Sequence, residues 1–145
     1  MGKDLHTVIR LAKYEVDEKR RALGEILERE HQIERAQAHI EAQRDHEEAT
    51  ARADPVGVGM SWGNYVRRYM AERDNLAAML ASVREAIEAA REELAESYRR
   101  LKTYEQAQAA RDRRAQEELN RKEQTALDEM AQNMVRRRGE GGGTL

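Results

Sequence analysis

The sequence contains no cysteine, no phenylalanine and only one proline. Its six aromatic residues are one Trp and five Tyr. Without cysteine, disulfides and thiol chemistry are excluded. So few aromatic side chains cannot fill a thick globular interior. No stretch approaches the roughly 18 consecutive apolar residues of a membrane span, and the first residues lack the apolar run of a signal peptide. We therefore expect a cytoplasmic protein.

Charge of either sign is not in excess, because 26 basic residues face 28 acidic ones in 145. The long-range field therefore gives no reason to expect a nucleic acid or an anionic membrane as partner. Charged residues nevertheless make up 37% of the chain. This composition is typical of long, solvated helices.

A first helix is predicted over residues 5–53, with Asp4 as its cap. Its apolar residues recur at alternating steps of four and three, which is the seam of a coiled coil. Eight of eleven seam positions are apolar, and Lys19, Glu30 and Gln37 are not. The seam positions are Leu5, Ile9, Ala12, Val16, Lys19, Leu23, Ile26, Glu30, Ile33, Gln37 and Ile40. A polar residue on such a seam can specify register at a cost in stability.

A second, much longer helix is predicted over residues 62–138, which contain no proline and only one glycine. The same period continues through thirteen positions, of which only Arg73 and Ser97 are polar. The apolar ones are Trp62, Val66, Tyr69, Leu76, Leu80, Val83, Ile87, Ala90, Leu94, Leu101 and Tyr104. The pattern predicts a coiled-coil seam from residue 62 to residue 104.

Residues 54–61 separate the two helices. Pro55, Gly57 and Gly59 disfavour helix or permit a turn, and Ser61 is a suitable N-cap for the second helix. Two striped helices joined by a short loop pack most simply as an antiparallel hairpin. We therefore predict an all-α fold, a single coiled-coil domain over residues 1–138, followed by a disordered tail over residues 139–145.

The two predicted helices differ in length, so the second must overhang the first. If paired residues have numbers that sum to about 115, Leu5 lies beside Ala110. Beyond Tyr104 the seam positions turn polar, beginning with Gln108 and Arg111. The seam of the second helix thus ends close to the residues that pair with the start of the first helix. The segment beyond is either a solvated, fraying helix or a surface that binds a partner.

No catalytic or metal-binding pattern emerges. His31, His39 and His46 lie off the seam, and an open hairpin offers no pocket to shift carboxylate pKa values for acid–base catalysis. The segment around Gly57 and Gly59 lacks the Lys-Ser/Thr of a phosphate-binding loop. We predict no enzymatic activity, no cofactor and no metal.

Three parts of the sequence are distinctive beyond their periodicity. They are Glu15–Glu18 with Ala22–Glu25, then Ser61–Tyr65, and above all Asn120–Ala131, which reads Asn-Arg-Lys-Glu-Gln-Thr-Ala-Leu-Asp-Glu-Met-Ala. These segments resemble the FliJ family of flagellar export proteins. The resemblance covers nearly the whole chain. The sequence departs from the family in lacking phenylalanine and in placing Arg67 and Arg68 where more apolar surface is expected.

The resemblance implies a non-enzymatic stalk of the flagellar type III export apparatus. Such a stalk enters the centre of the hexameric export ATPase, promotes its assembly and activity, and connects it to the cytoplasmic domain of the membrane export gate. It also escorts export chaperones. The implied location is cytoplasmic, peripheral to the inner membrane at the flagellar base.

By position, the resemblance also suggests contact residues. Those expected to bind the ATPase are Arg121, Lys122, Gln124, Leu127, Asp128 and Met130. Those expected to bind the export gate are Ile40, Tyr65, Tyr69, Leu76 and Met79. Ile40, Tyr69 and Leu76 also lie on the predicted seam, whereas Tyr65 and Met79 lie off it.

Two alternatives remain open from sequence. One is the equivalent stalk of a virulence injectisome, which differs mainly in its partners. The other is a purely structural coiled coil in which two chains pair their seams. The hairpin predicts a monomer when free, and the structural coiled coil predicts a dimer.

Overall fold

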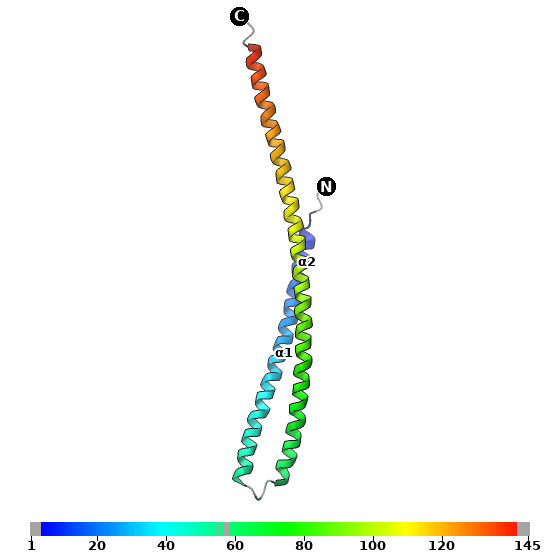
Figure 1. Cartoon of the computed structure of the whole chain (residues 1–145), viewed down its shortest axis with the longest axis vertical. Helices are drawn as coiled ribbons and strands as arrows, with labels where there is room; N and C mark the ends of the chain where they lie inside the picture. Colours follow the sequence, from blue (N-terminus) through cyan, green and yellow to red (C-terminus); the bar gives the residue numbers. More distant parts are fainter. Residues whose placement is uncertain (1–3, 55, 57–58, 142–145) are drawn as a thin grey trace. The chain divides into compact units, whose positions relative to one another are not determined.

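The fold consists of two long helices. The computed structural model describes residues 4–54, 56 and 59–141, and these contain α1 (His6–Ala53) and α2 (Gly59–Gly141), with no strand among them (Figure 1). The predicted all-α fold is confirmed. The contacts divide the chain into two compact units. We call Ala12–Arg99 the hairpin unit, and Met1–Leu11 with Arg100–Leu145 the terminal unit.

The helix ends differ slightly from those predicted. The Asp4 carboxylate accepts the backbone N–H of His6 at 3.1 Å, as expected of a cap. α2 begins at Gly59, before the predicted start at residue 62, so Ser61 lies inside the helix. It ends at Gly141, beyond residue 138, and no described glycine adopts the positive φ of a left-handed cap. The predicted turn residues Pro55, Gly57 and Val58, and residues 142–145 of the predicted tail, lie outside the described residues.

In the hairpin unit, α1 and α2 pack antiparallel along the predicted seams (Figure 1). Every α1 seam position from Ala12 to Ile40 is buried or half-buried, although three of them are polar. The buried cluster consists of Ile33, Ile40, Tyr69, Leu76, Val83 and Ile87. Burial of one apolar stripe per helix thus holds the hairpin together.

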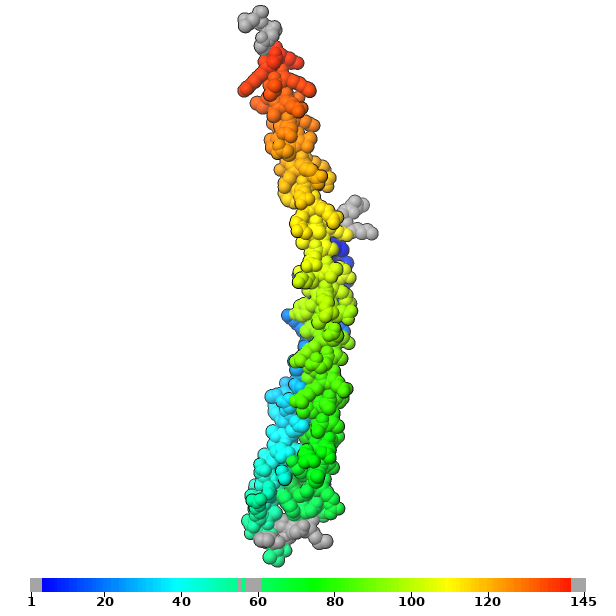
Figure 2. Space-filling model, in the orientation of Figure 1, coloured from blue at the N-terminus to red at the C-terminus, as the bar shows by residue number. Residues whose placement is uncertain are grey.

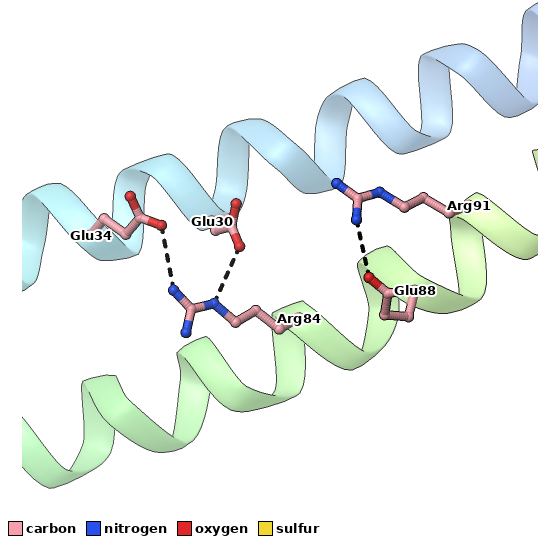
Figure 3. Close-up of polar contacts among 5 residues, drawn as sticks. All are labelled: Glu30, Glu34, Arg84, Glu88 and Arg91. Carbon is pink, nitrogen blue, oxygen red and sulfur yellow. Dashed lines mark hydrogen bonds and ion pairs between the residues drawn. The ribbon is translucent and has the colours of Figure 1, made fainter.

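Two of the three polar seam residues of α1 form ion pairs across the hairpin. The Lys19 ammonium lies 2.9 Å from the Glu93 carboxylate. Arg84 lies 3.4 Å from Glu30 and 3.8 Å from Glu34, whereas Arg91 pairs at 3.0 Å with Glu88 on its own helix (Figure 3). Exposed pairs contribute only about 0–1 kcal/mol each. We infer that these pairs specify the register more than they stabilise it.

The two polar seam residues of α2 behave differently from each other. Ser97 is the most deeply buried side chain described, with 1% exposed, and its hydroxyl donates to the Leu94 carbonyl at 2.8 Å. Its polarity is thus satisfied within its own helix. Arg73 is exposed, and its guanidinium lies over the Tyr69 ring, 5.8 Å from the ring centroid.

In the terminal unit, the start of α1 packs against α2 and leaves the rest of α2 uncovered. The Leu5 N–H donates to the Gln108 side-chain oxygen at 3.0 Å, two residues from the expected neighbour Ala110. Seam positions up to Ala110 are half-buried, and every residue from 111 to 141 is exposed. We call residues 111–141 the overhang, and the predicted extension of the second helix beyond the first is confirmed. Among the described residues, neither helix is long and apolar enough to cross a membrane.

Candidate functional site

The overhang carries large apolar side chains in solvent. Leu119, Leu127, Met130, Met134 and Val135 are each 50–70% exposed. The space-filling view shows no other segment over this stretch on the face in view (Figure 2). A helix that is exposed on every side, with no packing of its own, is stable only marginally unless a partner supports it. The overhang is therefore the first candidate interaction surface.

The six residues expected to bind the ATPase are all exposed, but they occupy different faces of α2. Successive residues are about 100° apart around a helix, so residues three and four apart share a face. Leu127, Met130 and Met134 accordingly form one apolar stripe. Arg121, Gln124 and Asp128 lie on another face, where the Gln124 amide donates to Asp128 at 3.1 Å. Lys122 reaches Glu118 at 3.9 Å.

Hydrogen bonds between residues four apart support the overhang from within. Such pairs contribute about 0.2–0.5 kcal/mol each. They join Gln108 to Asp112 at 2.9 Å, Gln116 to Asn120 at 3.1 Å, and Gln124 to Asp128 at 3.1 Å. This support is local to each turn, so it leaves the apolar stripe uncovered.

The residues expected to bind the export gate lie in the hairpin unit, and most belong to its core. Ile40, Tyr69 and Leu76 are 4–8% exposed and contribute to the buried cluster. Tyr65 is half-buried and packs against that cluster. Met79 is 44% exposed. Only Tyr65 and Met79 therefore present enough surface for a direct contact.

These two residues lie in separate grooves. Tyr65 lines a groove with Ile40, Gln43, Glu47, Arg68, Tyr69 and Glu72. Met79 lines another with Arg29, Ile33, Ala78, Ser82 and Val83. The five residues are not brought together as one patch. We name the first groove the tyrosine groove.

Charged side chains surround the Tyr69 ring in the tyrosine groove. Its hydroxyl donates to the Glu41 carboxylate. The Arg44 guanidinium lies 5.2 Å from the ring centroid and Arg73 lies 5.8 Å from it. The hydrogen bond to Glu41, together with burial, raises the pKa of Tyr69, because both favour the neutral phenol.

Tyr65 is held beside Trp62, with ring centroids 5.7 Å apart and the planes 23° from parallel. Burial raises the pKa of Tyr65, and the negative charges of Glu47 and Glu72 raise it further. The groove thus combines aromatic walls with charges of both signs.

Sequence reasoning predicted Ile40 but missed the other α1 residues that line the tyrosine groove or contact Tyr69. Glu41, Gln43, Arg44 and Glu47 follow the last apolar seam residue, Ile40, so the apolar pattern gave no reason to select them. The antiparallel register could have identified them, because it places the residues just after Ile40 opposite Tyr69. Among the described residues, no group of three or more His, Asp or Glu side chains is arranged to hold a metal ion.

Comparison with known families identifies the family of the chain. A family model described as flagellar FliJ protein matches residues 1–140, which include both grooves and nearly all of the overhang. Searches of curated proteins and of solved structures returned no match. Because the family match extends over almost the entire chain, this protein belongs to the FliJ family, whose members are non-catalytic components of the flagellar export apparatus.

Proposed function

We propose that this protein is the stalk of the flagellar export ATPase and that its overhang enters the centre of the hexameric ring. The observation that carries the proposal is the change in α2 at residue 111. Up to Ala110 every seam position of α2 except Arg73 is buried or half-buried, and from residue 111 to residue 141 every residue is exposed. A helix without an internal partner is available to an external one.

The faces of the overhang suggest how its predicted contact residues act. Leu127 and Met130 provide apolar area, each about 60% exposed. Arg121, Gln124 and Asp128 provide polar contacts on another face, and Lys122 lies on a third face. Because these faces point in different directions, a partner that encloses the helix would contact all of them, whereas a flat surface would not.

The hairpin unit is proposed to connect the ATPase to the export gate. Tyr65 and Met79 are the direct contacts in this proposal, and Ile40, Tyr69 and Leu76 act by holding the two helices in place. Escort of export chaperones and a cytoplasmic position at the inner face of the flagellar base complete the proposal. It includes no catalytic role and no nucleic-acid partner. The family match favours the flagellar apparatus over the injectisome.

The test measures ATP hydrolysis by the purified export ATPase with and without this protein. Full-length protein should stimulate hydrolysis, and a chain ending at Ala110 should not. Leu127→Glu with Met130→Glu should reduce stimulation at least about fivefold, since each removes an apolar anchor. Met70→Glu is the matched control, because Met70 lies on α2 in the hairpin unit and is 45% exposed.

Stimulation by the chain ending at Ala110 would move the ATPase contact to the paired stretch. If neither chain has an effect where the ring assembles, the stalk proposal loses its support. A purely structural coiled coil would then be the better account.

A further inference from the structure

The guanidinium groups of the overhang differ from many others in the described part of the chain, because they form no ion pair. In the hairpin unit, ion pairs occupy Arg21, Arg35, Arg52, Arg73, Arg84 and Arg91. Among the described residues, none of the seven overhang arginines forms an ion pair. They are Arg111, Arg113, Arg114, Arg121, Arg136, Arg137 and Arg138, and all are exposed. Their guanidinium groups are therefore available to bind carboxylates from outside the chain.

Six of these arginines form two groups. The first collar is Arg111, Arg113 and Arg114, and the second collar is Arg136, Arg137 and Arg138. At a rise of 1.5 Å per residue, the collar centres lie roughly 35 Å apart along α2. Between them, residues 115–135 carry the two cations Arg121 and Lys122 against five carboxylates. The overhang therefore presents bands of positive, negative and positive charge.

The members of each collar point in different directions around the helix. Arg136, Arg137 and Arg138 are successive residues, so they spread in steps of about 100°. Arg111, Arg113 and Arg114 likewise spread over much of the circumference. A flat surface would reach only some of the arginines in a collar. A partner that surrounds the helix could reach all of them.

We propose that the two collars bind two tiers of carboxylates lining the channel of the ATPase ring, and that their separation sets how deeply the overhang inserts. This inference rests on the proposed function and adds the chemistry of the partner. Charge pairs confined in a channel with little water are stronger than the same pairs in bulk water. The negative band between the collars would disfavour insertion to a wrong depth, because it would then face the acidic tiers.

The first test is binding of the full-length protein to the purified ATPase hexamer at about 50 mM and about 300 mM salt. Changing either collar to three glutamates should weaken binding at low salt at least tenfold, about 1.4 kcal/mol. The affinity of these variants should also change less between the two salt concentrations than the affinity of the wild type. The control is Arg10→Glu with Lys13→Glu and Lys102→Glu, which makes the same change in net charge at exposed positions outside the overhang. This control should bind as the wild type does.

The second test asks whether the separation of the collars sets the depth of insertion, or whether the collars only attract the ring electrostatically. Insertion of seven helix-forming residues after Ala115 keeps both collars but moves them about 10 Å further apart. The insertion variant should bind the ATPase only as tightly as a variant in which one collar has been changed to glutamates. If the insertion binds as the wild type does, the two tiers are not at a fixed separation and the proposal is wrong.

The chain ending at Ala110 distinguishes failure of this inference from failure of the stalk proposal. If it does not bind while both collar variants bind normally, the stalk proposal stands and the collars have no role. If it binds as tightly as the full chain, both proposals fail. Loss of binding to anionic vesicles or to duplex DNA in the collar variants, without loss of ring binding, would assign the collars to those partners instead.

Discussion

At the scale of single residues, Tyr69 serves both the core and the surface. Its ring lies in the buried cluster, with 7% of the residue exposed. Its hydroxyl reaches Glu41, and the guanidinium groups of Arg44 and Arg73 lie over its ring. Tyrosine suits such a boundary because it combines an apolar body with a polar end. Tyr69 therefore acts mainly in packing, and its ring is held within the hairpin.

The raised pKa of Tyr69 gives a testable pH dependence. Folding favours its neutral form, so this contribution to stability is complete below the ordinary tyrosine value of 10.0 and is lost as pH rises through the folded value. The melting temperature should therefore fall less steeply between about pH 9 and about pH 11 in Tyr69→Phe than in the wild type. Thermal melts followed by circular dichroism measure this slope.

Tyr14→Phe is the matched control, because Tyr14 is 63% exposed on α1. The slope of Tyr69→Phe is compared with the slope of this variant as well as with that of the wild type. Equal slopes for Tyr69→Phe and the wild type would show that the hydrogen bond to Glu41 does not couple ionisation to folding.

At the scale of helices, α2 lies in two environments. Up to Ala110 it is the partner of α1, and beyond that residue it is exposed on all sides. The sequence predicted this division well, because the apolar period ends at Tyr104 and most of the following seam positions are polar, beginning with Gln108 and Arg111. Periodicity records which side chains can be buried, so it is reliable where burial decides the structure.

The helix ends and the polar seam residues were harder to predict. α2 continues through Gly139 to its end at Gly141 although glycine costs about 1 kcal/mol relative to alanine, so a glycine in the sequence did not mark the end of the helix. Ser97 is buried although polar, because its hydroxyl donates a hydrogen bond to a carbonyl of its own helix. Such local bonds leave no signal in an apolar pattern. The partner contacts assigned by resemblance stay predictions, since they depend on proteins outside this chain.

The same substitution at two places in α2 should have different effects. Leu76 is 8% exposed and Leu127 is 60% exposed. Leu76→Ala should lower the free energy of unfolding by about 2–3 kcal/mol, because it leaves a cavity in the core. Leu127→Ala should change it by less than about 0.5 kcal/mol. Urea unfolding followed by circular dichroism gives both values.

If Leu76→Ala were as stable as the wild type and yet lost binding to the export gate, Leu76 would be a surface contact and not a packing residue. A large loss of stability in Leu127→Ala would mean that the overhang packs against something within the chain or in a second copy.

At the scale of the whole molecule, the free protein should be a monomer. The seams of α1 and α2 cover each other within the chain, so little of the seam is left to pair with a second copy. Light scattering after size exclusion should give a mass near 16.7 kDa. A mass of about twice that value at all concentrations would favour the structural coiled coil, whose seams pair between chains.

The core of the hairpin unit ends well before the helices do. Ile40 and Tyr69 are the buried residues nearest the connection, and residues 41–47 of α1 are all exposed. The contact from Tyr69 to Glu41 already spans 28 positions of sequence. Formation of the fully buried contacts therefore requires closure of a sizeable loop, and these contacts must compensate its entropy. Because loop entropy rises only by about 0.6 kcal/mol for each doubling of length, chain added at the connection should cost little stability, which melting of loop-extended variants would measure.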